Sequence, residues 1–494
     1  MGRRKKPLPY IENLEIIDAG AEGKAVGKWN DRVVFVPFAA PGDLVDVKVY
    51  KKRRSYYEAR IENLRKASEF RVKPVCDHFG LCGGCKWQHF DYRQQLAFKE
   101  KQVKDSLDRI GKVTYPEIQP IIGSDNEYYY RNKLEFTFSS RRWFTEMDPE
   151  KSAGGPENTQ GLGFHLPGMF DKVLDITHCY LQPEPSNKIR NAVREFAIRH
   201  HIDFYDIRQE KGLLRNLMIR TSSTGDTMVL VVFYKKEKET IRMIMDFIKE
   251  KFPEVTSLLY MINPKKNDSI YDLEVMAWHG LPYIMEEMPP PDENQPVLRY
   301  KVGPKSFYQT NPKQAQKLYR TAFEFANFRG DELVYDLYTG TGTIANYIAH
   351  TVQKVIGVDS VEEAIVDARE NAALNNITNQ EFLAGDLARI FDGSFLAKYG
   401  KPDVIITDPP RAGMHEKVIQ SILKAEPGKI VYVSCNPATQ ARDVALLDPK
   451  YEILKVQPVD MFPQTHHVEN VILMKLRYDR HTPQMINAET DLNT

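Results

Sequence analysis

Apolar residues follow three successive patterns along this chain. From residue 8 to residue 66 they form short segments, such as Val33–Val36 and Leu44–Val49, separated by Gly, Pro and Asp. Short strands with such turns are typical of a small β-barrel of the kind that binds oligonucleotides. The pattern therefore predicts an N-terminal barrel of about five strands.

From residue 67 to residue 299, helical and strand patterns are mixed. Apolar positions between Leu96 and Ile110 repeat at helical spacing and Gly111 follows them, which predicts a helix near 92–110. Residues 134–139 alternate with period two, which predicts a strand. Residues 145–160 are polar and rich in Gly and Pro, which predicts an exposed loop.

From residue 300 to residue 480, strand and helix patterns alternate, which predicts a doubly wound parallel sheet. The expected strands lie near 333–338, 354–358, 380–384, 403–407 and 430–434, and the expected helices near 312–327, 343–350, 361–374 and 414–425. Segments 451–456 and 468–476 are expected to form an antiparallel edge hairpin, and a polar tail follows at 481–494.

The net charge of the 494 residues is only +1, but the charge is unevenly spread. Residues 1–75 hold 17 Lys and Arg against 10 Asp and Glu, which suggests a polyanion partner, a solvated charged surface being the alternative. Tyr56 and Tyr57 follow a basic run and are expected either to stack on RNA bases or to pack across strands. The run consists of Lys51, Lys52, Arg53 and Arg54, which are expected to contact RNA phosphates.

No apolar run is long enough to cross a membrane. The N-terminus also lacks the apolar core of a secretory signal, so we expect a cytoplasmic protein. We expect no obligate protein partner.

Three strands of the predicted parallel sheet end in polar turns. The first precedes Gly340-Thr341-Gly342, the fourth ends at Asp408-Pro409-Pro410-Arg411, and the fifth ends at Cys435. Carboxyl ends of parallel strands share one edge of a sheet, where open α/β sheets bind ligands. The sequence therefore predicts one ligand site built from these turns.

The glycine turn is a candidate cofactor site. Gly340 and Gly342 would let the backbone approach a ligand, and the next helix would add N–H donors. Asp359 could accept hydrogen bonds from ribose hydroxyls, and Asp386 from an adenine amino group. A nicotinamide cofactor and a turn without a ligand are the alternatives, since the turn satisfies the relaxed dinucleotide pattern. A dehydrogenase has no evident need for the thiol or the Asp-Pro-Pro-Arg turn, which favours S-adenosylmethionine.

A thiol beside a sulfonium cofactor suits methylation of a pyrimidine at C5. Addition of the Cys435 thiolate to C6 would make C5 nucleophilic, and a base would then remove the C5 proton. Glu469 is the candidate base, with His466 and His467 as alternatives. Asp408 could hold the uracil or the cofactor amine, and Arg411 a pyrimidine carbonyl or a phosphate. The alternatives to these roles are a buried structural cysteine and a surface carboxylate.

Four other cysteines form a candidate cluster site, namely Cys76, Cys82, Cys85 and Cys179. Four thiolates suit zinc or an iron–sulfur cluster. The wide first spacing and the single distant ligand favour [4Fe–4S] over zinc. An odd number of cysteines argues against a disulfide framework, and a structural or RNA-orienting role is expected of the cluster.

Taken together, these motifs resemble the RNA (uracil-5-)-methyltransferases, most closely the ribosomal RNA type. The resemblance covers nearly the whole chain. It rests on a TRAM-like segment at 8–66, the four cysteines, Tyr130-Arg131-Asn132-Lys133, Ser306–Asn311, Asp336–Gly342, Asp408–Gly413, Ser434–Pro437 and His466–Glu469. Thr339 and Asp359 depart from the family, where Cys and Glu are frequent.

The resemblance implies Cys435 as nucleophile and Glu469 as base, and a target base flipped out of the RNA. It implies a [4Fe–4S] cluster on the four cysteines and places Asp408 near methyl transfer. The cofactor contacts that it implies are Gln309, Tyr338, Thr343, Asp359 and Asp386. We also expect Arg131, Lys133 and Arg411 to contact the RNA substrate.

The expected fold is multidomain α+β. It comprises a TRAM-like barrel at 1–66, a central α+β domain with the cluster at 67–299 and a Rossmann-like, doubly wound α/β methyltransferase domain at 300–480. The expected function is the formation of 5-methyluridine in RNA, specifically 23S ribosomal RNA. The alternatives are a transfer RNA enzyme and an RNA-binding or assembly factor without catalysis.

Overall fold

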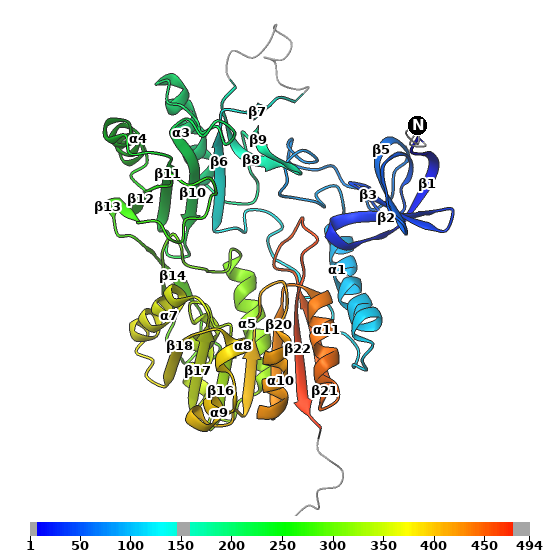
Figure 1. The fold of residues 1–494 in the computed structure, drawn as a ribbon, viewed down its shortest axis with the longest axis vertical. Helices are drawn as coiled ribbons and strands as arrows, with labels where there is room; N and C mark the ends of the chain where they lie inside the picture. Colours follow the sequence, from blue (N-terminus) through cyan, green and yellow to red (C-terminus); the bar gives the residue numbers. More distant parts are fainter. Residues whose placement is uncertain (1–6, 146–158, 478–494) are drawn as a thin grey trace, which may run out of the picture.

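The computed structural model describes residues 7–145 and 159–477 of the chain (Figure 1). Strands in this part form a closed barrel, an eight-stranded sheet, a two-stranded hairpin and a seven-stranded sheet. Most of the loop predicted at 145–160, and the tail at 481–494, lie outside the described residues. Among the helices that are described, none combines the length and the apolar character that a membrane span requires.

The predicted N-terminal barrel of five strands is present (Figure 1). Its strands close in the order β1-β2-β3-β5-β4. Alternation along β4 turns Val45, Val47 and Val49 into the interior, where each is at most 2% exposed, while Lys48 faces solvent. The strands are β1 (Tyr10–Ala19), β2 (Lys24–Trp29), β3 (Arg32–Pro37), β4 (Leu44–Lys52) and β5 (Tyr56–Lys66).

An irregular segment, residues 67–90, carries three cysteines from the barrel to α1 (Tyr92–Ser106). The Asp91 carboxylate caps this helix by accepting from the backbone N–H of Arg93. A single π-helical turn, Leu107–Gly111, ends the helix, so the prediction of a helix near 92–110 is confirmed except for its last turn.

The central sheet has the strand order β13-β12-β11-β10-β6-β8-β9-β7. Its strands are β6 (Lys133–Ser139), β7 (Arg142–Trp143), β8 (Gly161–Leu166), β9 (Met169–Asp175), β10 (Leu214–Thr221), β11 (Thr227–Phe233), β12 (Ser257–Ile262) and β13 (Met276–Gly280). Helices α3 (Ser186–Arg199) and α4 (Lys238–Lys251) pack on one face. The other face packs toward the hairpin of β14 (Ile284–Met288) and β15 (Leu298–Val302).

The C-terminal sheet has the order β18-β17-β16-β19-β20-β22-β21, in which the first five strands are parallel. Strand β22 runs antiparallel to both of its neighbours, which confirms the predicted hairpin. The strands are β16 (Leu333–Leu337), β17 (Lys354–Asp359), β18 (Gln380–Ala384), β19 (Val404–Thr407), β20 (Lys429–Ser434), β21 (Tyr451–Val459) and β22 (Glu469–Leu476).

Helices cover both faces of this sheet, as a doubly wound fold requires. One face carries α5 (Pro312–Ala326), α6 (Thr343–Ile348) and α7 (Glu362–Leu374). The other carries α8 (Leu387–Ile390), α9 (Gly393–Tyr399), α10 (Glu416–Ala425) and α11 (Pro437–Leu447).

The sequence prediction missed α8, α9 and α11. The first two are too short to show a helical period. Helix α11 begins at Asn436-Pro437, a pair that also suits a turn; here the Asn436 side chain caps the helix and Pro437 occupies its first turn.

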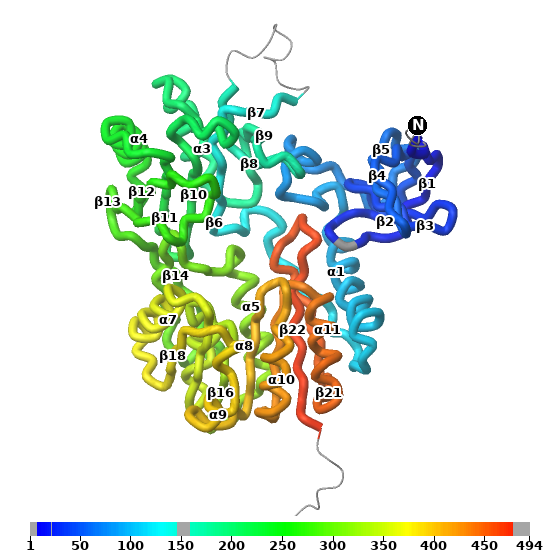
Figure 2. The backbone as a smooth tube through the Cα atoms, in the orientation of Figure 1, coloured from blue at the N-terminus to red at the C-terminus, as the bar shows by residue number. Residues whose placement is uncertain are grey.

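The loop between β21 and β22, residues 460–468, reaches away from the sheet toward the other parts of the chain (Figure 2). It lies against the irregular cysteine segment and α1, and its Asp460 N–H donates to the Ile122 carbonyl at 2.9 Å. We call residues 460–468 the junction loop, because the barrel region, the central region and the C-terminal sheet all approach it.

Candidate active site

Three turns meet at one edge of the C-terminal sheet because β16, β19 and β20 are neighbours. Cys435 directly follows β20, and Glu469 is the first residue of β22. Since β22 runs antiparallel to β20 and pairs Asn470 with Ser434, Glu469 enters at the edge where Cys435 leaves. The sheet register therefore brings the two proposed catalytic residues to the same place.

The Cys435 side chain is half-buried, not sealed in the interior. Burial and the negative charges of Glu469 and Asp408 raise the pKa of this thiol to about 11, against the opposing effect of Arg411. The thiol is accessible but is held protonated in the free protein.

Asn436 connects the turn that carries Cys435 to the Asp-Pro-Pro-Arg turn through hydrogen bonds. Its side-chain amide donates to the Arg411 carbonyl at 2.9 Å, and its side-chain oxygen caps α11. The next turn of the same helix also contributes, because the Thr439 hydroxyl donates to the Arg411 carbonyl at 3.2 Å. These contacts fix the backbone of Arg411 relative to Cys435.

Glu469 is only 5% exposed, and burial together with the nearby Asp408 raises the pKa of its carboxyl group well above the ordinary range. Burial and Asp336 likewise raise the pKa of Asp408. A carboxyl group with a raised pKa is suited to exchange a proton near neutral pH. Arg411 opposes the shift at Glu469 and is itself exposed at the site.

The two histidines of the junction loop lie beside this group. Burial, with neighbouring cations, lowers the pKa of His466 to about 4 and that of His467 to about 3, so both rings are neutral near pH 7. His467 Nε2 lies 3.4 Å from Arg411 Nη2. In the tautomer that leaves Nε2 unprotonated, the neutral His467 ring can accept a hydrogen bond from the Arg411 guanidinium.

The glycine turn leaves room for a ligand. A Cβ atom added at Gly340, whose φ is +55°, would meet nothing within 4 Å, whereas one at Gly342 would approach Ala368 Cβ to 3.0 Å. Gly340 therefore faces open space, and Gly342 is required for packing and for its φ of +76°. Tyr338 also has a positive φ of 64°, which turns the chain out of β16.

Asp359 is the last residue of β17 and Asp386 lies just after β18, as the sequence predicted. One Asp359 carboxylate oxygen accepts from the Gly340 N–H at 2.9 Å and the other from the Val361 N–H at 2.9 Å. Each oxygen keeps a further acceptor position, because a carboxylate offers about four. Asp386 is exposed and caps α8 by accepting from the Ala388 N–H.

The segment 306–311 lies against the glycine turn. The Thr341 hydroxyl donates to the Phe307 carbonyl at 3.1 Å, which holds half-buried Gln309 next to the turn. Thr343, the first residue of α6, is 9% exposed. The Phe307 ring is 67% exposed, and the sequence analysis did not single it out. Its only sequence signal was a large apolar residue inside a polar motif.

Asp443 is a second residue that the sequence analysis missed. Its side chain is fully buried, and one carboxylate oxygen accepts from the Tyr432 hydroxyl at 2.7 Å and from the Met414 N–H at 2.8 Å. It thereby supports the turn that presents Arg411.

The four remaining cysteines all line one largely apolar cavity of about 150 Å³. Cys85 and Cys179 are each 9% exposed, and Cys76 and Cys82 are half-buried. Burial raises the pKa of Cys82 to about 11 and that of Cys85 to about 12. Among the described residues, no three His, Cys, Asp or Glu side chains are arranged to hold a metal ion.

The basic candidates for RNA contact lie on separate elements. Lys52, Arg53 and Arg54 are exposed at the end of the barrel hairpin, whereas Lys51 forms an ion pair with Glu58 at 2.7 Å. Tyr57 is 6% exposed and packs edge-on against Trp29, so cross-strand packing accounts for this ring. Base stacking by Tyr57, the other interpretation of this residue, has no support from its burial.

Arg131 and Lys133 lie on the central part of the chain. The Arg131 guanidinium lies 5.2 Å from the centre of the Phe462 ring in the junction loop. Lys133 forms an ion pair with Glu135 at 2.9 Å. Arg131 thus belongs to the surroundings of the junction loop, while Lys133 lies on β6.

The chain is similar to several known proteins and protein families. Residues 281–477 match the family described as tRNA (Uracil-5-)-methyltransferase, and residues 12–61 match the TRAM domain. A relative from Bacteroides thetaiotaomicron, described as an uncharacterized RNA methyltransferase, is 54% identical over 92% of this chain and 100% of its own length. One from Porphyromonas gingivalis, with the same description, is 54% identical over 93% of this chain and 99% of its own.

A solved structure matches over the same length. The Pyrococcus abyssi tRNA (uracil-54, C5)-methyltransferase, in complex with S-adenosyl-L-homocysteine, has a TM-score of 0.71 and 28% sequence identity. The match covers 94% of this chain and 99% of that protein.

Proposed function

Because the chain belongs to the S-adenosylmethionine-dependent RNA (uracil-5-)-methyltransferases, we propose that it makes 5-methyluridine in 23S ribosomal RNA through a covalent bond between Cys435 and uridine C6. The observation that carries this proposal is the meeting of Cys435 and Glu469 where β20 ends and β22 begins. Asp408 and Arg411 lie at the same edge and complete the set of groups that the reaction needs.

The mechanism uses these side chains in order. The Cys435 thiol first releases its proton to solvent, and the thiolate then adds to C6 of the flipped-out uridine. The C5–C6 electron pair moves toward the C4 oxygen, where Arg411 can stabilise the charge. Bound S-adenosylmethionine supplies the methyl group that C5 then takes up. Glu469 removes the C5 proton, the C6–S bond breaks, and Cys435 leaves as a thiolate. The two neutral histidines would orient Arg411 and exclude water.

The cofactor contacts are part of the proposal. Asp359 would accept from the ribose hydroxyls and Asp386 from the adenine amino group. Open space at Gly340 and the position of Gln309 support a ligand along this turn. The remaining contacts that we propose are Tyr338, Gly342, Thr343 and Asp408.

We also propose that the four-cysteine cavity holds a [4Fe–4S] cluster. The donor set fits, because four thiols share the wall of one apolar cavity. Each cysteine of such a cluster binds a different iron, so the sulfurs need not converge on one point as they do around zinc. Burial raises the pKa of Cys82 and Cys85, which favours their protonated form. Bound iron would reverse this effect and keep both side chains as thiolates. The cluster would tie Cys179 to the segment that carries the other three.

Anaerobically purified protein should therefore contain about four iron atoms and four acid-labile sulfides per chain. Cys179→Ala should lose most of both, whereas Cys435→Ala should retain them, because Cys435 does not line that cavity. Iron and sulfide assays with elemental analysis check the result. One zinc per chain without sulfide would contradict the cluster.

Domain roles complete the proposal. Residues 1–66 would bind RNA as a TRAM-like barrel, residues 67–299 would form the cluster-containing domain, and residues 300–480 would carry out methyl transfer. The exposed cations Lys52, Arg53 and Arg54 support the first role. Arg131, Lys133 and Lys51 would add further RNA contacts.

Transfer RNA is the second candidate substrate. It is favoured by the match to the Pyrococcus abyssi enzyme, whose name specifies tRNA uracil-54. A methylation assay would decide between the two substrates. The protein is incubated with labelled S-adenosylmethionine and with ribosomal RNA or transfer RNA from cells that lack the protein. Label recovered as 5-methyluridine in 23S ribosomal RNA supports the proposal, and label in transfer RNA alone assigns the second substrate. Absence of label in both would leave the non-catalytic alternative.

A further inference from the structure

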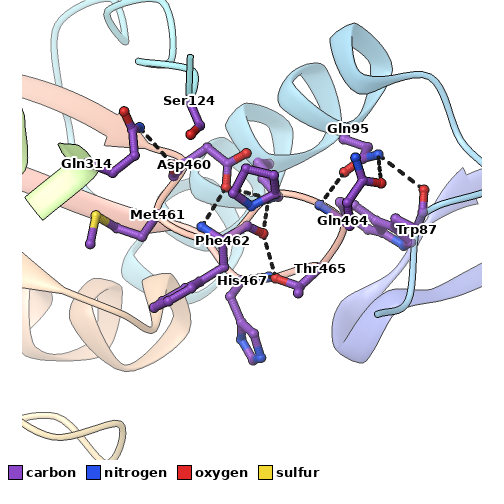
Figure 3. Close-up of polar contacts among 12 residues, drawn as sticks. Trp87, Gln95, Ser124, Gln314, Asp460, Met461, Phe462, Gln464, Thr465 and His467 are labelled. Carbon is purple, nitrogen blue, oxygen red and sulfur yellow. Dashed lines mark hydrogen bonds and ion pairs between the residues drawn. The ribbon is translucent and has the colours of Figure 1, made fainter. Parts of the chain in front are cut away.

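The junction loop is held by a fully buried ion pair that the chemistry above does not use. Lys99 Nζ lies 2.6 Å from Asp460 Oδ1, and neither side chain is exposed. Lys99 also donates to the Phe462 carbonyl at 3.1 Å. The Phe462 N–H in turn donates to Asp460 Oδ1 at 3.0 Å (Figure 3). The second Asp460 oxygen accepts from the Tyr92 hydroxyl at 2.9 Å. The pair is therefore satisfied from α1 and from the loop itself.

A second set of contacts joins the middle of the loop to α1. The Gln464 N–H donates to the Gln95 side-chain oxygen at 3.0 Å, and the Gln95 amide donates to the Gln464 side-chain oxygen at 3.0 Å (Figure 3). The Gln464 carbonyl accepts from the N–H groups of Lys86 and Trp87, next to the cysteine cavity. Gln464 is only 2% exposed and has a positive φ of 66°, so this backbone shape depends on these partners.

The same contacts continue to the barrel. The Trp87 indole N–H donates to the Gly23 carbonyl at 3.3 Å. A Cβ added at Gly23 would lie 3.2 Å from His466 Nδ1, which shows that the barrel backbone directly abuts the loop. Any shift of the barrel when RNA binds would therefore press on the loop.

At its other end the loop enters the active site. His467 contacts Arg411, and Glu469 begins β22 one residue after the loop. Val459 pairs with Glu469 across β21 and β22, so Asp460, at the foot of the loop, lies one residue from this pair. The ion pair thus fixes the loop at the place where the proposed base is anchored.

The free energy of folding alone does not explain why Lys99 and Asp460 are charged. A buried ion pair bears a large desolvation cost, and well-packed apolar residues of similar size often stabilise a protein as well or better. What the charged pair adds is directional hydrogen bonding to Phe462, Tyr92 and the loop backbone. These directions specify one loop conformation.

We propose that Lys99 and Asp460 are positioning residues for methyl transfer, holding the junction loop so that Glu469 and the Arg411–His467 contact stay aligned with Cys435. This inference rests on the proposed function, because it assigns no chemistry of its own. It predicts that weakening the pair slows the reaction of bound RNA more than it weakens RNA binding.

Lys99→Met in the full-length protein is the direct test, since Met matches the length of the Lys side chain without its charge. Displacement of a catalytic group by about 1 Å can cost about 100-fold in rate, so we expect kcat to fall by about 10- to 100-fold. The KM for RNA should change by less than about threefold. The rate at which the variant forms a covalent adduct with 5-fluorouridine-substituted RNA should fall in parallel with kcat.

Arg215→Met is the matched control. Arg215 is 1% exposed and lies on β10, where it forms an ion pair with Asp268 at 2.8 Å and donates to the carbonyls of Asn263, Lys265 and Asn267. Its guanidinium also lies 4.4 Å from the centre of the Tyr205 ring, and none of these partners belongs to the junction loop. Like Lys99→Met, Arg215→Met should lower the melting temperature, but it should leave kcat within about twofold below the unfolding transition. If Lys99→Met does not fold, Asp460→Asn takes its place, because the amide oxygen can still accept from Lys99.

Several outcomes overturn the inference. They are a kcat of folded Lys99→Met within twofold of the unchanged protein, an equal loss of kcat in Arg215→Met, and, where Asp460→Asn is used, a kcat unchanged within threefold. Wild-type protein is assayed alongside. Absence of wild-type methylation on every RNA would overturn the proposed function, whereas an active wild type with an unaffected Lys99→Met variant overturns only the positioning role.

Discussion

Replacing Cys435 with alanine is expected to abolish methyl transfer, with a loss of about 10⁴-fold or more, because no other thiol lies at this edge of the described sheet. The affinity for RNA should stay within about twofold, since a half-buried thiol contributes little contact area. Affinity for S-adenosylmethionine should also be kept, because the glycine turn is formed by β16 and α6. Scintillation counting of labelled RNA and a filter-binding assay measure the two quantities.

Cys435→Ser provides the matched variant. It keeps nearly the same size, but a hydroxyl does not ionise in the range where a thiol does. It should be as inactive as Cys435→Ala, and both should keep the melting temperature of the wild type. Methylation by either variant at more than about one hundredth of the normal rate would rule out thiolate addition.

The Cys435 reaction should also accelerate as pH rises. Burial and nearby carboxylates raise the pKa of the thiol to about 11 in the free protein, so the thiolate fraction grows throughout the alkaline range. The rate of adduct formation with 5-fluorouridine-substituted RNA follows this fraction.

Glu469→Gln is expected to separate the two halves of the reaction. Glutamine cannot take up the C5 proton, so methyl transfer should proceed while elimination of Cys435 slows by about 10²- to 10⁴-fold. A covalent protein–RNA species that carries the labelled methyl group should accumulate. Denaturing gel electrophoresis, with label detected in both protein and RNA, checks this result.

His467→Gln is the control for this prediction, because His467 contacts Arg411 and is one of the two histidines considered as alternative bases. It should slow turnover without trapping the adduct. A Glu469→Gln protein that turns over at the normal rate, or an adduct that accumulates in His467→Gln instead, would move the role of base to the histidine.

The grouping of the candidate site residues at one edge of the C-terminal sheet could largely be predicted from the sequence, for a geometric reason. In a parallel sheet every strand delivers its carboxyl end to one edge, so Gly340, Asp408 and Cys435 had to lie near one another once their strands were recognised. Glu469 was harder, since its position depends on β22 running antiparallel beside β20. The edge hairpin was predicted, but its register was not.

The residues that hold the site in place could not be predicted, because each acts through a partner that is distant in the sequence. Lys99 and Asp460 are 361 positions apart, and each alone is an ordinary charged residue. Asp443 was not singled out, because its role depends on Tyr432, which lies on β20 and 11 positions away in the sequence. In the barrel, the basic run was recognised, while the burial of Tyr57 depends on Trp29 across the sheet. Patterns along a chain reveal periodicity and turns, not partners.

The covalent step remains the most direct point at which to test this account. RNA that contains 5-fluorouridine cannot lose the C5 substituent as a proton, so the adduct should persist after methyl transfer. Incubation with this RNA and S-adenosylmethionine, followed by nuclease and protease digestion and mass spectrometry, identifies the modified residue. The account predicts a methylated fluorouridine on the peptide that contains Cys435. An adduct on any other residue, or 5-methyluridine formation from normal RNA with no adduct from the substituted RNA, would contradict it.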